Sequence, residues 1–182
     1  MKILMGIGNS LRCDDGAGVY IAETFGENSL KVTVDSEGSK GSEGSEGSND
    51  SDRHEDSKGW KIFNCGTAPE NFTGIIRKEH PSLLVIIDAA NMGSGVAPGG
   101  FKIIPGDLIE DVGIGTHQMP LSALIDFMSD SADEIILIGI QPEIVDDGEE
   151  ISETVKAGID SLINILKKES VKDIPRLVLQ TK

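Results

Sequence analysis

Short runs of apolar residues alternate along the chain with stretches whose apolar positions recur at helical spacing. The runs predict strands at residues 2–7, 83–87, 99–104 and 134–140. Residues 31–34 and 61–63 are two further β-type stretches, and the sequence leaves open which of them joins the sheet. Helices are predicted at residues 17–25, 69–79, 120–128 and 151–168. This alternation predicts right-handed crossovers, and hence a three-layer α/β fold with a mostly parallel sheet and helices on both faces.

Residues 35–59 interrupt this pattern with a repeat of serine, glycine and acidic residues that contains no large apolar side chain. Such a segment cannot bury enough surface to offset the entropy of ordering it. We therefore expect a flexible insert at 35–59 within a single domain that spans residues 1–168. An acidic docking segment for a partner is the alternative interpretation. Residues 169–182 are predicted to form a poorly ordered C-terminal tail.

The charge and the cysteine content exclude several classes of protein. The formal net charge of −15, from 31 acidic and 16 basic residues among 182, argues against a nucleic-acid partner. The two cysteines, Cys13 and Cys65, are too few for a disulfide scaffold. The N-terminus lacks the features of a signal peptide, and no apolar run approaches the ~18 residues of a membrane span. We expect a cytoplasmic protein that is by default a monomer and has no membrane partner.

Polar residues that follow apolar runs are the candidates for chemistry, because open α/β sheets bind ligands beyond the carboxyl ends of their strands. Asp88 directly follows a buried run, where a carboxylate is costly unless it is paired, hydrogen-bonded or metal-bound; a helix N-cap or loop anchor is the other interpretation. Asp14 and Asp15 precede a helix, where negative charge also favours the helix dipole. Adjacent residues at a helix start point in different directions, so the two carboxylates need not share one role.

His117 lies in a loop before a predicted helix and, taken alone, is an ordinary histidine. Together with Asp15 and Asp88 it would supply one nitrogen and two oxygen ligands. Such a set suits a divalent ion such as nickel or zinc and leaves coordination positions open for a substrate or water. His54, within the insert, and His80, in a turn before a proline, are weaker candidates.

Other sequence features argue against nucleotide binding and against two common protease classes. The Gly6-x-Gly8 turn lacks the third glycine of a dinucleotide-binding loop, and two aspartates stand where a pyrophosphate would approach. Cys13 and Cys65 are interpreted as small buried residues rather than as soft metal ligands. The chain contains neither a Gly-x-Ser-x-Gly elbow nor a His-Glu-x-x-His helix, so an ordinary serine or zinc protease is unsupported.

Five motifs lie at predicted strand ends or loops, in an order that is informative as a set. They are GIGNSLRCDDGAG at 6–18, CGTAPEN at 65–71, IIDAANMG at 86–93, THQMPL at 116–121 and LIGIQPEIV at 137–145. In this order they resemble the hydrogenase maturation endopeptidases, and most closely the branch that serves formate-hydrogenlyase-type (hydrogenase 3-like) enzymes. The resemblance covers roughly residues 1–34 and 60–168 and implies a twisted sheet of about five strands flanked by helices.

The resemblance also implies a reaction. Members of this family remove a short C-terminal extension from the precursor of a [NiFe]-hydrogenase large subunit after nickel has been inserted, so nickel is expected to arrive with the precursor. Carried over by motif, the implied metal-binding and catalytic residues are Asp15, Asp88 and His117. Nickel would polarise the scissile carbonyl or activate a water, and no nucleophilic side chain is required.

Two features depart from the usual pattern of the family. Asn64 stands where the family usually has an aspartate, and an amide can form hydrogen bonds but cannot act as a base. Compact members of the family also lack the insert at 35–59. Asn64 keeps open the alternative of a non-catalytic, nickel-sensing module that binds the precursor without cutting it. The start GIGNS also resembles that of peptidyl-tRNA hydrolases, but the net charge of −15 opposes the basic surface that tRNA requires.

Overall fold

The computed structural model describes residues 1–26, 59–113 and 119–178 of the chain. The predicted insert therefore lies, apart from Gly59, outside the described residues. The same is true of the β-type stretch at 31–34 and of His54 and His117.

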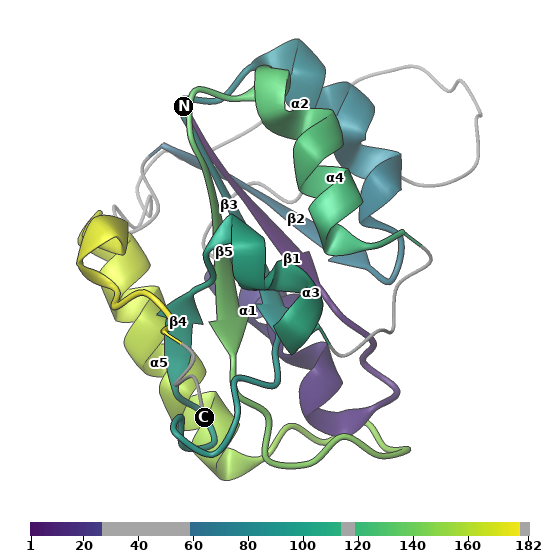
Figure 1. The fold of residues 1–182 in the computed structure, drawn as a ribbon, viewed down its shortest axis with the longest axis vertical. Coiled ribbons are helices and arrows are strands. Elements are labelled where there is room, and N and C mark those ends of the chain that lie inside the picture. Colours follow the sequence, from purple (N-terminus) through teal and green to yellow (C-terminus); the bar gives the residue numbers. More distant parts are fainter. Residues whose placement is uncertain (27–58, 114–118, 179–182) are drawn as a thin grey trace, which may run out of the picture.

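The strands within the described residues are β1 (Lys2–Ile7), β2 (Trp60–Gly66), β3 (Leu83–Ala89), β4 (Phe101–Ile103) and β5 (Ile135–Ile140). They form one sheet with the order β2-β1-β3-β5-β4 (Figure 1). All neighbours pair in parallel except β4, which pairs antiparallel with β5 at the edge. The predicted mostly parallel sheet of about five strands is confirmed, and residues 61–63 pair within it as part of β2.

The helices within the described residues are α1 (Ala17–Gly26), α2 (Thr73–Glu79), α3 (Ile109–Val112), α4 (Leu121–Met128) and α5 (Glu153–Lys167). Four of them correspond to predicted helices, although the segment predicted at 69–79 begins with a 3-10 turn at Pro69–Phe72. The short helix α3 was not predicted, because four residues show no periodicity. None of these helices is long and apolar enough to cross a bilayer.

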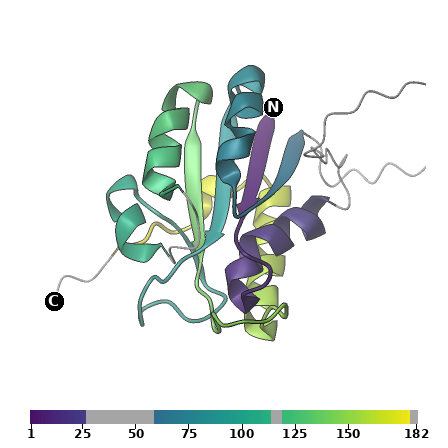
Figure 2. The same ribbon diagram turned by 90° about the vertical axis from the view of Figure 1, so that its right-hand side faces the viewer.

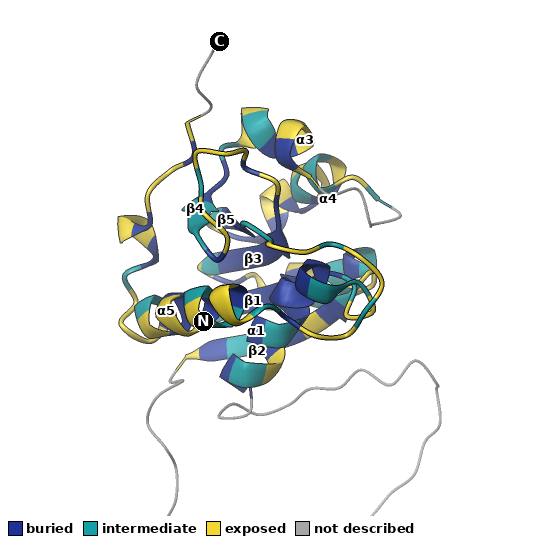
Figure 3. Ribbon diagram, turned by 90° about the horizontal axis from the view of Figure 1, so that it is seen from below, coloured by how far each residue is buried: buried dark blue, intermediate teal, exposed yellow. Residues whose placement is uncertain are grey.

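The helices cover both faces of the sheet, as predicted (Figure 2). α1 and α5 pack on one face against alternate residues of β3 such as Val85 and Ile87. α2, α3 and α4 pack on the other face, where Leu84 and Ile86 point. Because both faces are covered, β1 and β3 are buried along nearly their whole length (Figure 3). This double burial explains why these strands are continuous apolar runs in the sequence.

The segment after Ser170 differs from the predicted tail. Val171, Ile174 and Leu177 are buried against the rest of the fold. The backbone of Ile103 donates to Pro175 at 3.0 Å and accepts from Leu177 at 2.8 Å. The prediction of a poorly ordered tail is therefore wrong for residues 171–178, which begin with a 3-10 turn and form an isolated β-bridge from Arg176 to Ile103 of β4. Residues 179–182 lie outside the described part of the chain.

Candidate functional site

The order of the strands places a topological switch point at the carboxyl ends of β1 and β3. From β1 the chain first forms β2 on one side and then β3 on the other. Open α/β sheets bind ligands in the crevice at such a reversal. Asp14 and Asp15 lie in the 3-10 turn Cys13–Gly16 that follows β1, and Asp88 is the penultimate residue of β3. These three acids therefore lie beside the switch point.

The glycine-rich turn after β1 holds Asp15 through its backbone. The N–H of Asn9 donates to the Asp15 carbonyl oxygen at 3.2 Å. Gly8 has a φ of +144°, and a Cβ built on it would overlap the same carbonyl oxygen. Only glycine permits this close approach without strain. The turn thus has a structural task in placing the buried Asp15.

The carboxylate of Asp14 is engaged by the loop that leads from β5 to α5. The N–H groups of Glu143 and Ile144 donate to its Oδ2 at 2.8 and 2.9 Å. Ser152 donates its N–H to Oδ1 at 2.7 Å and its hydroxyl to Oδ2 at 2.8 Å. Asp14 is fully buried, and these donors occupy both of its oxygens. These bonds give Asp14 a structural role, and Asp15 stays the candidate ligand of the pair.

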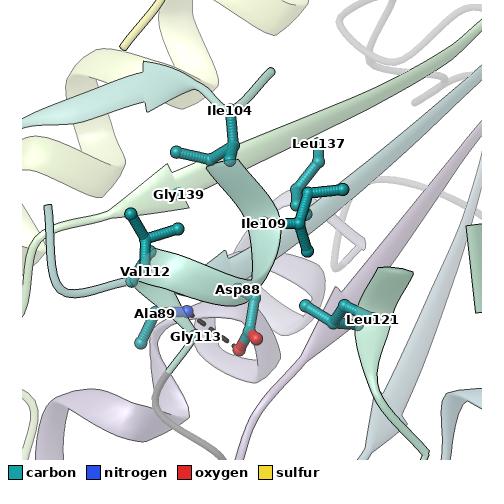
Figure 4. A pocket seen from close by; sticks show the side chains of 10 residues that line it. Asp88, Ala89, Ile104, Ile109, Val112, Gly113, Leu121, Leu137 and Gly139 are labelled. Atoms are coloured by element: carbon teal, nitrogen blue, oxygen red, sulfur yellow. Dashed lines mark hydrogen bonds between the residues drawn. The ribbon is translucent and has the colours of Figure 1, made fainter. Parts of the chain in front are cut away.

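Asp88 is buried at the end of β3, with 4% of its surface exposed. Its Oδ1 accepts the N–H of Ala89 at 2.9 Å (Figure 4). The small pocket beside it is mainly apolar and is lined by side chains from the loop after β4, α3, α4 and β5, namely Ile104, Ile109, Val112, Leu121 and Leu137. A carboxylate in such surroundings is strongly stabilised by a nearby cation. No helix begins at Asp88, so the N-cap interpretation is wrong.

The structure brings two of the three predicted ligands to one edge of the sheet. The 3-10 turn that carries Asp15 contacts β3, whose end carries Asp88. His117, the third, lies outside the described residues. Gly113 and Leu121, which are described on either side of that segment, both line the Asp88 pocket. Within the described ranges no group of three histidine, cysteine or acidic side chains is arranged to hold a metal.

Three weaker candidates, His80, Cys65 and Cys13, lie within the described residues. His80 ends α2 with a φ of 42°, and its Nε2 lies 3.4 Å from Asp133 at the opposite end of the sheet. Cys65 is buried, as expected, and burial raises the pKa of its thiol far above the usual range. Cys13 is only partly buried, so the interpretation of a buried residue is wrong there. Its sulfur packs against Gly148.

Asn64 lies at the carboxyl end of β2, in register with Gly6 of β1. Its side-chain oxygen accepts the N–H of Gly66 at 3.1 Å, and its amide donates to Glu23 Oε1 at 3.0 Å. The amide group thus joins β2 to α1 through a carboxylate, and an aspartate at this position would meet Glu23 with like charge.

Two further residues organise the same edge, although the sequence analysis assigned neither of them a role. Gln141, which follows β5, accepts the N–H of Met92 at 2.7 Å through its side-chain oxygen. Ser152 precedes α5 and has the sequence signature of an N-cap, yet it makes no side-chain capping bond and instead donates to Asp14. Only knowledge of the distant partner could have distinguished the two roles of this serine.

Comparisons with known proteins agree with this architecture. The sequence matches the hydrogenase maturation protease family (HycI) over residues 50–169. The hydrogenase 3 maturation protease of Escherichia coli K12 is 32% identical over 166 residues, which cover 91% of this chain and 88% of that protein. The solution structure of the endopeptidase HycI from Escherichia coli has a TM-score of 0.75 at 29% identity, covering 100% of this chain and 99% of that one.

A third comparison extends the similarity to an archaeal protein. The crystal structure of the [NiFe] hydrogenase maturation protease HycI from Thermococcus kodakarensis has a TM-score of 0.65 at 27% identity, covering 93% of this chain and 91% of that one. These relatives are named proteases or endopeptidases, which confirms the predicted enzyme class. The chain therefore belongs to the hydrogenase maturation protease family and is a peptide hydrolase.

Proposed function

We infer that the protein removes a C-terminal extension from the nickel-loaded precursor of a [NiFe]-hydrogenase large subunit. The observation that carries this proposal is the placement of two buried acids, Asp15 and Asp88, at the carboxyl ends of neighbouring strands beside the switch point. Membership of the hydrogenase maturation proteases supports the choice of substrate.

Asp15, Asp88 and His117 are the proposed ligands of the nickel ion, which belongs to the substrate. Two carboxylate oxygens and one imidazole nitrogen suit a divalent ion of this type. Three ligands from the protease leave further coordination positions for groups of the precursor. The set therefore fits a metal that arrives already bound to the precursor, so that a precursor without nickel lacks part of what the protease recognises.

The nickel ion supplies Lewis-acid chemistry when it is bound, by polarising the scissile carbonyl or by activating a water. The residues of this chain hold and orient the metal-bearing segment of the precursor. The apolar side chains around Asp88, from α3 and α4, limit the access of bulk water and strengthen electrostatic attraction at the carboxylate.

We further propose that the protein acts in the cytoplasm as a monomer, with the precursor as its partner. The two cysteines, Cys13 and Cys65, are both described and both free, as expected for a reducing compartment. Light scattering of the purified protein tests the proposed monomeric state. The expected result is a single species of about 19.3 kDa.

Mass spectrometry of a hydrogenase large-subunit precursor tests the reaction. The precursor is incubated with the protein in nickel-loaded and nickel-free forms. We expect loss of a C-terminal peptide from the nickel-loaded form only. Cleavage of both forms would contradict the role of nickel, and cleavage of neither would contradict the proposed reaction. A nickel-dependent complex without a change in mass would instead indicate the binding module.

A further inference from the structure

The loop between β5 and α5 is attached to the turn after β1 by contacts that run through Asp14. Besides the four hydrogen bonds to its carboxylate, the backbone N–H of Asp14 donates to the Ile144 carbonyl at 3.1 Å. The neighbouring Cys13 donates to the Gly148 carbonyl at 2.7 Å, and Gly148 donates to Leu11 at 2.9 Å. The two segments are therefore joined on both sides of the buried carboxylate.

The charge of Asp14 suits its position at the beginning of α5. Ser152, which precedes this helix of 15 residues, directs its N–H at Oδ1. Negative charge at this end of a helix is favourable. Hydrogen bonds to an ionised acceptor are also roughly twice as strong as neutral ones. An uncharged side chain of the same shape would lose both contributions, so the joint depends on the carboxylate itself.

The attachment of Asp14 also restrains Asp15, because Asp15 directly follows Asp14 in the same 3-10 turn. Its N–H donates to the Arg12 carbonyl at 3.1 Å, and its own carbonyl accepts from Asn9 at 3.2 Å. With Asp14 fixed to the loop before α5, the backbone of Asp15 is held between two anchored segments.

We propose that Asp14 is a positioning residue, which acts through the loop at 143–152 to hold Asp15 where it engages the metal-bearing substrate. The inference rests on the proposed function for the identity of that substrate. Misplacement of a reacting group by about 1 Å lowers the rate roughly 100-fold. A residue that fixes the position of Asp15 should therefore have a large effect on the rate of processing.

The variant Asp14→Asn tests the proposal while keeping the size of the side chain. An amide places an NH2 group where one carboxylate oxygen accepted, so at least one donor then faces another donor. Asp147→Asn is the matched control, since it removes the same charge from an exposed position on the same loop. Ser152→Ala is a milder second variant, because it deletes one hydroxyl contact and keeps the others.

Steady-state kinetics of the processing of the nickel-loaded precursor distinguishes a positioning role of Asp14 from a contribution to the stability of the fold alone. For folded Asp14→Asn we expect kcat to fall about 10- to 100-fold with KM within about threefold, since Asp88 and His117, two of the three proposed metal ligands, still bind the substrate. Ser152→Ala should show a smaller loss of kcat in the same direction. A kcat for Asp14→Asn within twofold of that of Asp147→Asn would overturn the proposal. A lower melting temperature of Asp14→Asn with unchanged kcat would overturn it as well.

Hydrogen exchange in the free protein provides a readout that does not depend on the reaction. The amide of Asn9 reports on Asp15, whose carbonyl it binds, and it does not touch Asp14 itself. We expect Asn9 to exchange at least about tenfold more rapidly in Asp14→Asn than in Asp147→Asn. Unchanged exchange at Asn9 would overturn the positioning role of Asp14, whether or not the wild-type protein cleaves the precursor. Failure of the wild-type protein to cleave the precursor would separately refute the proposed function.

Discussion

The backbone of Gly18 lies directly against the carbonyl oxygen of Ile87, the residue that precedes Asp88. A Cβ built on Gly18 would overlap this oxygen and that of Ile7 as well. α1 therefore approaches β1 and β3 with no side chain between them. This close contact fixes how near α1, and the turn Cys13–Gly16 before it, lies to the ends of the strands. The packing of α1 therefore affects the position of Asp15.

The substitution Gly18→Ala is expected to destabilise the protein by about 3 kcal/mol, because rigid backbone atoms must move to accept the methyl group. Gly74→Ala is the control, since Gly74 is exposed in α2 and a Cβ there meets no atom within 4 Å. We expect this control to raise the free energy of unfolding by about 0.5–1 kcal/mol. Denaturant unfolding measures both changes, and equal effects of the two substitutions would contradict the packing argument.

Replacement of any proposed ligand should abolish precursor processing while leaving the fold intact. For Asp15→Asn, Asp88→Asn and His117→Ala we expect losses of at least about 100-fold, because each removes one of the proposed ligands of the metal. Circular dichroism checks the fold, and mass spectrometry of the nickel-loaded precursor measures processing. Asp147→Asn should process normally, whereas full activity in any of the three ligand variants would remove that residue from the proposed set.

The sequence predicted the central elements well because their environment is simple. β1 and β3 are covered on both faces, so each is a continuous apolar run whose end is marked by a glycine or an acid. Asp88 could be identified as a candidate for the same reason. A carboxylate next to a fully buried run requires a compensating interaction, whatever the fold.

Features that depend on distant partners could not be predicted. The structural role of Asp14 arises from hydrogen bonds to residues 129 to 138 positions away, which no local pattern shows. The antiparallel direction of β4 is likewise invisible in a strand of three residues. The segment 171–178 has isolated apolar residues among charged ones, and they become core residues only because they pack against distant elements such as β4.

Deletion of residues 36–58 should leave processing within about threefold of wild type, since surface insertions are tolerated at low cost. The described ends of this part of the chain are close, because a Cβ on Gly26 would lie 3.7 Å from the side chain of Ile62. The remaining nine residues between Gly26 and Gly59 can extend about 30 Å, which is ample.

The shorter connection should also raise the free energy of unfolding by about 1 kcal/mol, through a smaller loop-closure entropy. Processing of the nickel-loaded precursor and denaturant unfolding are measured on the same deletion variant. If the variant folds but no longer processes the precursor, the deleted segment takes part in docking, as an acidic partner-binding segment would.

The buried thiol of Cys65 should make the protein less stable in alkaline solution. Burial raises its pKa far above the ordinary value of 9.0, so the native thiol keeps its proton where the unfolded one loses it. The resulting stability is fully present below pH 9 and is lost as the pH rises, by about 1 kcal/mol between pH 9 and pH 10.

Urea unfolding of wild type and Cys65→Ala at pH 8, 9 and 10 isolates this contribution from that of other groups that titrate in the same range. We expect the difference in unfolding free energy between the two proteins to shrink as the pH rises. Cys13→Ala is the control, because it keeps the buried thiol and should retain the alkaline slope of the wild type. Parallel pH curves for wild type and Cys65→Ala would show that the native thiol ionises with the unfolded one.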